Sequence, residues 1–258
     1  MALNSFARFY YGLSIDTTNN KVNFSEGAGE LTATLTSGGY TFEEFADEIE
    51  RSMSSVGGQA YTVTTNRVTR RLTIAAAGNF TLKISTGSNT GISSYPLMGF
   101  TGADVTGTNT YAGNTECGSE YTPQFKLQDY ISSDDWQESV SVAVNESASG
   151  TIETVSFGTR SFVQMNIKYI SDKLWPTNGN WINNPSGVAD ARAFLQSITQ
   201  KVPVEFMPDK DAPITFQKLL LEKTPVSKNG TGYILKELYD RNLPDIYETG
   251  VLVFRVQT

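Results

Sequence analysis

The chain of 258 residues has no histidine and a single cysteine, Cys117. Histidine is the usual general base near neutral pH and the commonest metal ligand. Its absence excludes a Ser-His-Asp or Cys-His catalytic unit and a histidine-based zinc site. One cysteine forms no internal disulfide and holds no iron–sulfur cluster, and without a histidine to activate it we expect an inert thiol. The sequence therefore favours a protein that is not an enzyme, with no catalytic residue, metal or cofactor.

Charged residues are also scarce, at 18% of the chain, and the net charge is −7. A nucleic-acid-binding surface needs clustered Lys and Arg, so we expect no specific nucleic-acid partner. No apolar run approaches the roughly 18 residues of a membrane span, which argues against a membrane partner. The first residues lack the apolar stretch of a signal peptide. We therefore expect a chain that is made in a cytoplasm and stays soluble there.

Thr, Ser, Asn and Gly are abundant instead, which favours strands joined by many turns. One strong helix is predicted over residues 41–56, where Thr41 and Glu44 have the spacing of a capping box. Apolar residues recur on one face of this helix at spacings of three and four: Phe42, Phe45, Ile49, Met53 and Val56. Segments that alternate apolar and polar residues predict strands around the helix, at 31–35, 61–64, 72–74 and 80–84.

Two earlier strands, residues 10–16 and 21–24, are predicted to form a hairpin. The order of strands, helix and antiparallel meander predicts a small α+β module over residues 1–115, in which one helix covers one face of a sheet. The apolar cluster at 95–100 is expected to tuck under this module, and the polar stretch 101–119 is the best boundary.

The second half, residues 116–258, predicts a β-sandwich with one lateral helix. The helix is expected over 186–199. Strands are expected at 140–144, 151–157, 162–170, 204–206, 216–221, 233–238 and 251–256, with Gly158 to Arg160 as a break between two of them. The fold class expected for the whole chain is thus α+β and β-rich.

Few residues suggest chemistry. Asp209 and Asp211 have a spacing seen in oxygen-ligand metal loops, but the further ligands and the Gly turn of a calcium loop are missing, which favours a solvated turn. Trp175 and Trp181 lie in a loop rich in Pro, Gly and Asn, where they could stack on sugars, although burial or a subunit contact is the commoner role. No spacing identifies the paired carboxylates of a glycosidase, and no phosphate-binding loop is present.

Two segments resemble a known class of protein. Residues 204–209 (Val-Glu-Phe-Met-Pro-Asp), after a helix with Ala193-Phe194-Leu195, and residues 247–255 (Tyr-Glu-Thr-Gly-Val-Leu-Val-Phe-Arg) resemble tail structural proteins of tailed bacteriophages, in particular distal tail and baseplate proteins. This resemblance covers about residues 120–258. Residues 39–46 and 97–100 are similar to a strand-helix-meander module of phage and viral structural proteins.

The resemblance implies a non-enzymatic virion structural protein of a tailed bacteriophage, assembled in the host cytoplasm and located in the tail. It implies a β-sandwich ring component, expected as a hexameric homo-oligomer at the tail tube tip or baseplate, that docks neighbouring tail or fibre proteins. Ring contacts are expected on the second helix and on the last strand, at Phe194, Leu195, Val251, Val253, Phe254 and Arg255.

Alternatives stay open at this point. The N-terminal module departs from a plain distal tail protein, so a head–tail neck or decoration protein is one of them. A host-surface glycan-binding module would use Trp175 and Trp181 as stacking platforms. A polysaccharide-cleaving enzyme would need a pair of carboxylates held across a cleft.

Overall fold

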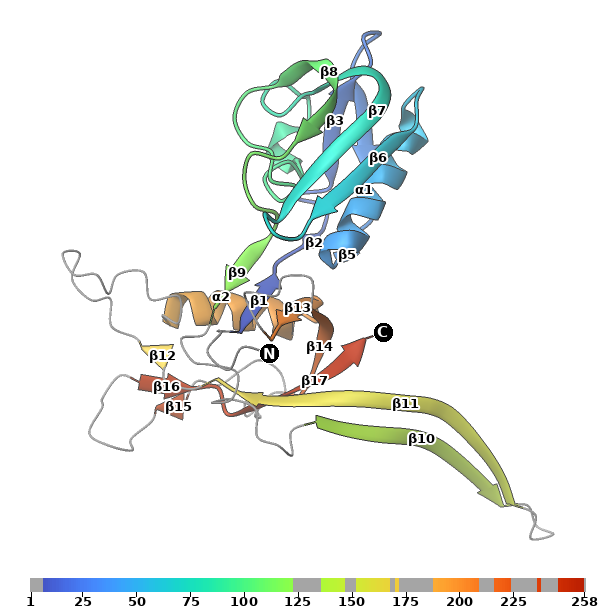
Figure 1. Cartoon of the computed structure of the whole chain (residues 1–258), viewed down its shortest axis with the longest axis vertical. Coiled ribbons are helices and arrows are strands. Elements are labelled where there is room, and N and C mark those ends of the chain that lie inside the picture. The colour runs from blue at the N-terminus through green and yellow to red at the C-terminus, as the bar shows by residue number, and fades with distance from the viewer. Residues whose placement is uncertain are drawn as a thin grey trace.

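The computed structural model describes residues 7–122, 136–146, 152–167, 170–171, 188–208, 216–223, 236–237 and 246–257. These residues form antiparallel sheets with a helix packed on a sheet, so the expected β-rich α+β class is confirmed (Figure 1). Two hydrophobic cores are present. The first is built from residues between Leu13 and Cys117. The second combines Ala7, Phe9 and Tyr121 with residues from Val163 onward. We refer to the elements around these cores as the first and second units.

The first unit is a five-stranded sheet in the order β4-β3-β7-β6, with β8 beside β7. Its strands are β3 (Lys21–Ser25), β4 (Leu31–Thr34), β6 (Tyr61–Asn66), β7 (Arg71–Leu82) and β8 (Val105–Ala112). A small pair, β2 (Ser14–Ile15) with β5 (Gly38–Gly39), and the 3-10 helix η1 (Thr90–Ile92) complete it.

Helix α1 (Phe42–Val56) begins at the predicted capping box. The Glu44 carboxylate accepts a hydrogen bond from the Thr41 backbone N–H at 2.9 Å, while the Thr41 hydroxyl accepts one from the Glu44 backbone N–H at 3.4 Å. The apolar face is buried as expected from Phe42 to Met53, whereas Val56, at the last turn, is 42% exposed. Burying these side chains supplies most of the helix's stability, because an isolated helix of this length is marginal in water.

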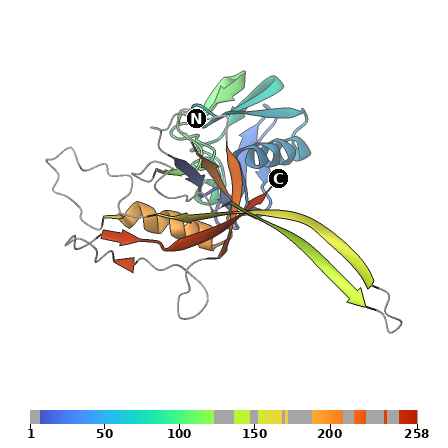
Figure 2. The ribbon, with the colours of Figure 1, turned by 60° about the horizontal axis from the view of Figure 1, so that its bottom comes forward.

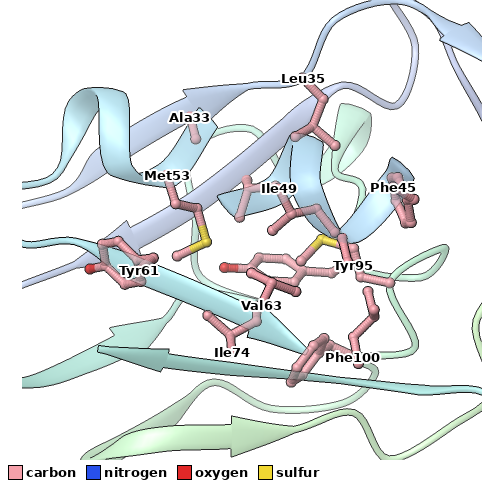
Figure 3. Close-up of a cluster of buried hydrophobic side chains, with 14 of the residues drawn as sticks. Ala33, Leu35, Phe45, Ile49, Met53, Tyr61, Val63, Ile74, Tyr95 and Phe100 are labelled. Atoms are coloured by element: carbon pink, nitrogen blue, oxygen red, sulfur yellow. The ribbon is translucent and has the colours of Figure 1, made fainter. Parts of the chain in front are cut away.

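Figure 3 shows how this face meets the sheet, with Ile49 and Met53 pointing toward Val63 and Ile74. Tyr95 and Phe100 enter the same core from the connection between β7 and β8, which confirms that the apolar cluster at 95–100 tucks under the first unit. The Tyr95 hydroxyl donates a hydrogen bond to the Asn23 carbonyl at 2.5 Å, so its polar end is satisfied in the core.

The second unit is a seven-stranded antiparallel sheet in the order β10-β11-β17-β14-β13-β1-β9, beside a three-stranded sheet in the order β12-β16-β15. The strands of the large sheet are β1 (Arg8–Tyr11), β9 (Ser119–Tyr121), β10 (Trp136–Glu146), β11 (Ile152–Asn166), β13 (Val204–Met207), β14 (Gln217–Lys223) and β17 (Val251–Gln257). The small sheet contains β12 (Ile170–Ser171), β15 (Lys236–Glu237) and β16 (Ile246–Glu248).

Helix α2 (Val188–Thr199) packs its apolar side against one face of the large sheet. Phe194 of α2 stacks on Tyr121 with ring centroids 4.8 Å apart and lies 4.9 Å from Phe9. Such aromatic clusters bury large areas and contribute strongly to the packing of a helix on a sheet. Among the described residues, no helix is long and apolar enough to cross a bilayer.

Strand β1 is where the structure departs most from the expected organisation. Phe9 is paired with Phe206 of β13 on one side and with Tyr121 of β9 on the other. The predicted hairpin of residues 10–16 with 21–24 is therefore wrong, because β1 belongs to the second sheet and β3 pairs with β4 and β7. The first unit is an insertion between β1 and β9, and the chain enters and leaves it at Tyr11 and Ser119, which are cross-strand partners.

Strand β11 is a single strand of 15 residues. The predicted break at Gly158 to Arg160 is wrong, because the chain stays in the strand. The ladder does shift register at this place: between the pairs Val140–Thr159 and Val142–Ser156, β10 has one residue and β11 has two. Such a bulge takes up an extra residue while the strands stay paired. Only residues 162–166 of β11 pair with β17. The rest pairs with β10 alone, so the two strands extend away from the body as a long arm (Figures 1 and 2).

Candidate functional site

The junction of the two units is built on a buried carboxylate. Glu205 is 2% exposed and lies on β13, on the face of the large sheet that is turned toward the first unit. The Arg70 guanidinium forms an ion pair with it and donates a hydrogen bond from Nη1. Arg70, in the turn between β6 and β7, is 1% exposed and has a positive φ of 51°. A charge so deeply buried needs its partner, because removing either one leaves an uncompensated ion.

Two further donors from the first unit reach the same carboxylate. The backbone N–H of Phe42 donates a hydrogen bond to Glu205 Oε1 at 3.1 Å. Phe42 is the first residue of α1, where free N–H groups and the helix dipole favour a negative charge. Arg67 Nη2 lies 3.5 Å from Glu205 Oε1. Glu205 therefore binds the beginning of α1 and the β6–β7 turn at once.

Aromatic rings flank both arginines. The Arg70 guanidinium lies over the rings of Tyr10 and Phe42, at 4.0 and 4.2 Å from their centroids. The Arg67 guanidinium lies 3.4 Å from the centroid of Phe216. Tyr10 and Phe216 come from the second unit, so each arginine holds the two units together by cation–π contact as well as by charge. These contacts join one unit to the other.

Two glutamates of α1 border the junction. Glu44 forms an ion pair with Lys218 of β14, and Glu43 forms one with Arg67. Burial raises the pKa of Glu43, although the neighbouring Arg67 guanidinium acts to lower it. Partly exposed pairs of this kind contribute little by themselves, about 0–1 kcal/mol each, so Glu205 remains the centre of the junction.

The far end of the first unit has a small hollow of about 190 Å³ that includes Glu26, Glu30 and Val56. Both carboxylates are already bonded within the chain. Glu26 accepts hydrogen bonds from the Gly58 backbone N–H at 2.8 Å and from the Tyr61 hydroxyl at 2.9 Å. Glu30 accepts one from the Ser88 backbone N–H at 2.9 Å. The carboxylates of the hollow therefore hold neighbouring loops together, and we do not assign a binding site to it.

The arm formed by β10 and β11 is the most prominent feature of the second unit (Figures 1 and 2). Along residues 152–161 it is a two-stranded ribbon in the described part of the chain, because β17 pairs only with the later residues of β11. At about 3.3 Å per residue, ten residues carry it roughly 30 Å beyond the sheet. The segment 136–159 contains three glutamates, Glu138, Glu146 and Glu153, and no Lys or Arg.

A second surface lies on the large sheet where the first unit does not cover it. We call it the open sheet face and define it by five residues of β11, β14 and β17 that are exposed or half-buried: Phe162, Leu220, Val251, Val253 and Arg255. Leu252 and Phe254, between the β17 members of this set, are 0% exposed and point into the core. Alternation along a strand therefore directs the open sheet face away from α2.

The residues expected at ring contacts form two groups, one in the core and one at the surface. Phe194, Leu195 and Phe254 are 0% exposed and belong to the chain's own core. Val251 is 49% exposed, and Val253 and Arg255 are half-buried, so these three reach the surface. Their role in a ring stays a prediction.

Other sequence candidates give a mixed outcome. Trp175, Trp181 and the turn from Asp209 to Asp211 lie outside the described residues. Cys117 is 1% exposed, and burial raises the pKa of its thiol to about 12. Within the part of the chain that the structure describes, no group of three or more His, Cys, Asp and Glu residues could hold a metal ion.

Sequence reasoning missed Glu205 and both arginines that face it. A signal was present, because a glutamate in the middle of Val-Glu-Phe-Met, a strand that is otherwise apolar, needs a buried partner. The partner could not be identified, since Arg70 is far away in the sequence and lies in a turn. Comparison with known proteins finds no family model and no curated protein that matches the chain.

Proposed function

We propose that the chain is a non-enzymatic structural subunit that assembles with copies of itself through the β10–β11 arm. The observation that carries the proposal is the ribbon that leaves the sheet where β17 stops pairing. A two-stranded ribbon is marginally stable alone in water, and its free edges are templates for further contacts. Packing on a neighbouring subunit would supply the missing contacts.

The assembly we propose is a ring in the tail of a tailed bacteriophage, at the tube tip or baseplate. The support is the resemblance of residues 204–209 and 247–255 to distal tail and baseplate proteins, together with the arm. An arm on one copy and its docking surface on the next make a heterologous contact, and such contacts close into rings. Six copies is the number that the resemblance implies.

The first unit has a separate role in this proposal. It is inserted between two adjacent strands and fixed by Glu205 at the beginning of α1, while its other end points away from the large sheet (Figure 1). A unit fixed in this way can present a surface to neighbouring tail or fibre proteins without disturbing the ring.

The test is the oligomeric state of the purified chain. We expect analytical ultracentrifugation and negative-stain electron microscopy to show closed rings of the whole chain. A variant with residues 142–156 deleted leaves Ser141, Phe157 and Gly158 as a short loop with a glycine, which suits a hairpin. This arm-shortened variant should fold with an unchanged near-ultraviolet circular dichroism spectrum and stay monomeric. A whole chain that stays monomeric at high concentration contradicts the proposal.

A further inference from the structure

We infer that the open sheet face receives the β10–β11 arm of a neighbouring copy of the chain, an inference that rests on the proposed function. The face is continuous across three strands. Phe162 of β11 and Leu220 of β14 are both cross-strand partners of Arg255, so the three form one row. Val253 lies one step further along β17, followed by Val251. Gln164 and Asn166 of β11 are the cross-strand partners of Val253 and Val251, so this stripe is apolar along β17, polar along β11, and has a cation, Arg255, in its first row.

This stripe is the part of the large sheet that no other described element covers. On the opposite side of the sheet, α2 packs over Phe9, Phe206 and Leu219. On the same side, the first unit covers β13 and the beginning of β14 through Glu205 and Lys218. Val251 is 49% exposed, which is unusual for a valine in a strand that is central to its sheet.

The charges of the arm and of the open sheet face indicate which segment binds this face. Beyond Arg160, which lies at its base, the arm (residues 139–159) contains two glutamates, Glu146 and Glu153, and no cation. The stripe carries Arg255, and Arg160 is exposed two residues before Phe162 on the same face of β11. Arg255 Nε is 4.0 Å from its nearest carboxylate, Glu222 Oε2, at the limit of an ion pair. The Arg255 guanidinium can contact a second carboxylate beside Glu222, and an acidic ribbon fits a face that presents Arg255 and Arg160.

The arm must come from another copy. The chain's own arm is the part of β10 and β11 beyond the residues that pair with β17, and it extends away from the sheet (Figures 1 and 2). It therefore cannot lie across the face from which it leaves. Arm and receiving face are different surfaces of the same chain, so the contact is heterologous and repeats from copy to copy.

A mixing experiment tests this arrangement. The arm-shortened variant keeps the receiving face, and a face-reversed variant, R160E/R255E, keeps the arm. We expect each to sediment as a monomer alone and a 1:1 mixture to sediment as a dimer that does not grow, because only one complementary pair of surfaces remains. R192E is the matched control, since Arg192 is exposed on α2 at the opposite side of the sheet, and it should assemble like the unchanged chain.

A charge swap gives a second readout. E146K/E153K should abolish assembly, and combining it with R160E/R255E in one chain should restore it. If the unchanged chain assembles and R160E/R255E assembles equally well, the receiving face is wrong while the proposed function stands. If the unchanged chain stays monomeric, both fail. If the 1:1 mixture stays monomeric although each variant keeps its circular dichroism spectrum, the inference is overturned.

Discussion

Arg70 and Glu205 form an ion pair that joins the two units, with side chains only 2% and 3% exposed. The pair connects a turn of the first unit to a central strand of the second unit. Because the Phe42 backbone N–H also reaches Glu205, the same carboxylate orients α1. The position of the first unit relative to the large sheet is therefore determined at one buried point.

Removing one partner of this pair should be costly. We expect E205Q and R70M each to lower the free energy of unfolding by about 3–5 kcal/mol, because each leaves a buried charge without its counterion. The double variant R70M/E205L should lose clearly less than the sum of the single losses. Urea denaturation measures all three, with R192M as an exposed-arginine control. Additive losses would show that the two residues act independently.

The pH dependence of stability should include a contribution from Glu48. Hydrogen bonds from Arg51, with a further one from the Thr36 backbone N–H, lower the pKa of Glu48 from 4.5 to about 2. The folded chain thus favours the ionised form, so this stabilisation is present above pH 4.5 and is lost as the pH falls through 2. The difference in unfolding free energy between the unchanged chain and E48Q should therefore shrink as the pH falls from 5 to 2.

The control for Glu48 is D47N, which removes a carboxylate from the exposed face of the same helix. Chemical denaturation at several pH values measures both variants. A constant difference between the unchanged chain and E48Q over this range would contradict the assignment.

Cys117 should resist thiol reagents until the chain unfolds. Its Sγ donates a hydrogen bond to the Leu97 carbonyl at 2.8 Å, and burial raises its pKa to about 12, so the reactive thiolate is scarce at pH 8. We expect Ellman's reagent to label the native chain no faster than the first unit opens, and to label the urea-unfolded chain within minutes. Fast labelling without denaturant would show that the thiol is accessible.

Gly99 and Gly102 provide a matched pair of substitutions. Both have a positive φ, 76° and 97°, but a Cβ on Gly99 would collide with the Thr115 carbonyl, whereas nothing lies within 4 Å of one on Gly102. We expect G102A to cost about 1–2 kcal/mol from its backbone conformation alone. We expect G99A to lower the free energy of unfolding by more than G102A. The difference between the two variants measures the close approach of Gly99 to the Thr115 backbone. Equal melting temperatures for the two variants would contradict this difference.

Local patterns predicted the local elements well. The capping box at Thr41 and the apolar spacing from Phe42 to Met53 identified α1, because both signals lie within a few residues of sequence. The last strand, Val251–Gln257, was predicted almost to its ends for the same reason. The alternation of Val140, Val142 and Val144 indicated a strand but not the arm, since its length depends on where β17 stops pairing.

Long-range placement was the part that the sequence did not reveal. Arg8–Tyr11 has the pattern of any half-buried strand, and nothing local indicates that its partners are Val204–Met207 and Ser119–Tyr121. The junction between the two units was not predicted, for a related reason. A buried Glu205 is recognisable only when Arg70, Arg67 and the Phe42 N–H are known to surround it, and these groups come from two segments that are both far from Glu205 in the sequence.

The position of β1 has a consequence for synthesis on the ribosome. At about 5–20 residues per second, Phe206 emerges roughly 10–40 s after Phe9. In that interval the first unit can complete its own core, and β9 follows closely enough to pair with β1 on one side. The other edge of β1 stays open until β13 arrives with Glu205. The nascent chain therefore carries an unpaired strand edge for most of its translation, with β9 as its only early cover among the described strands.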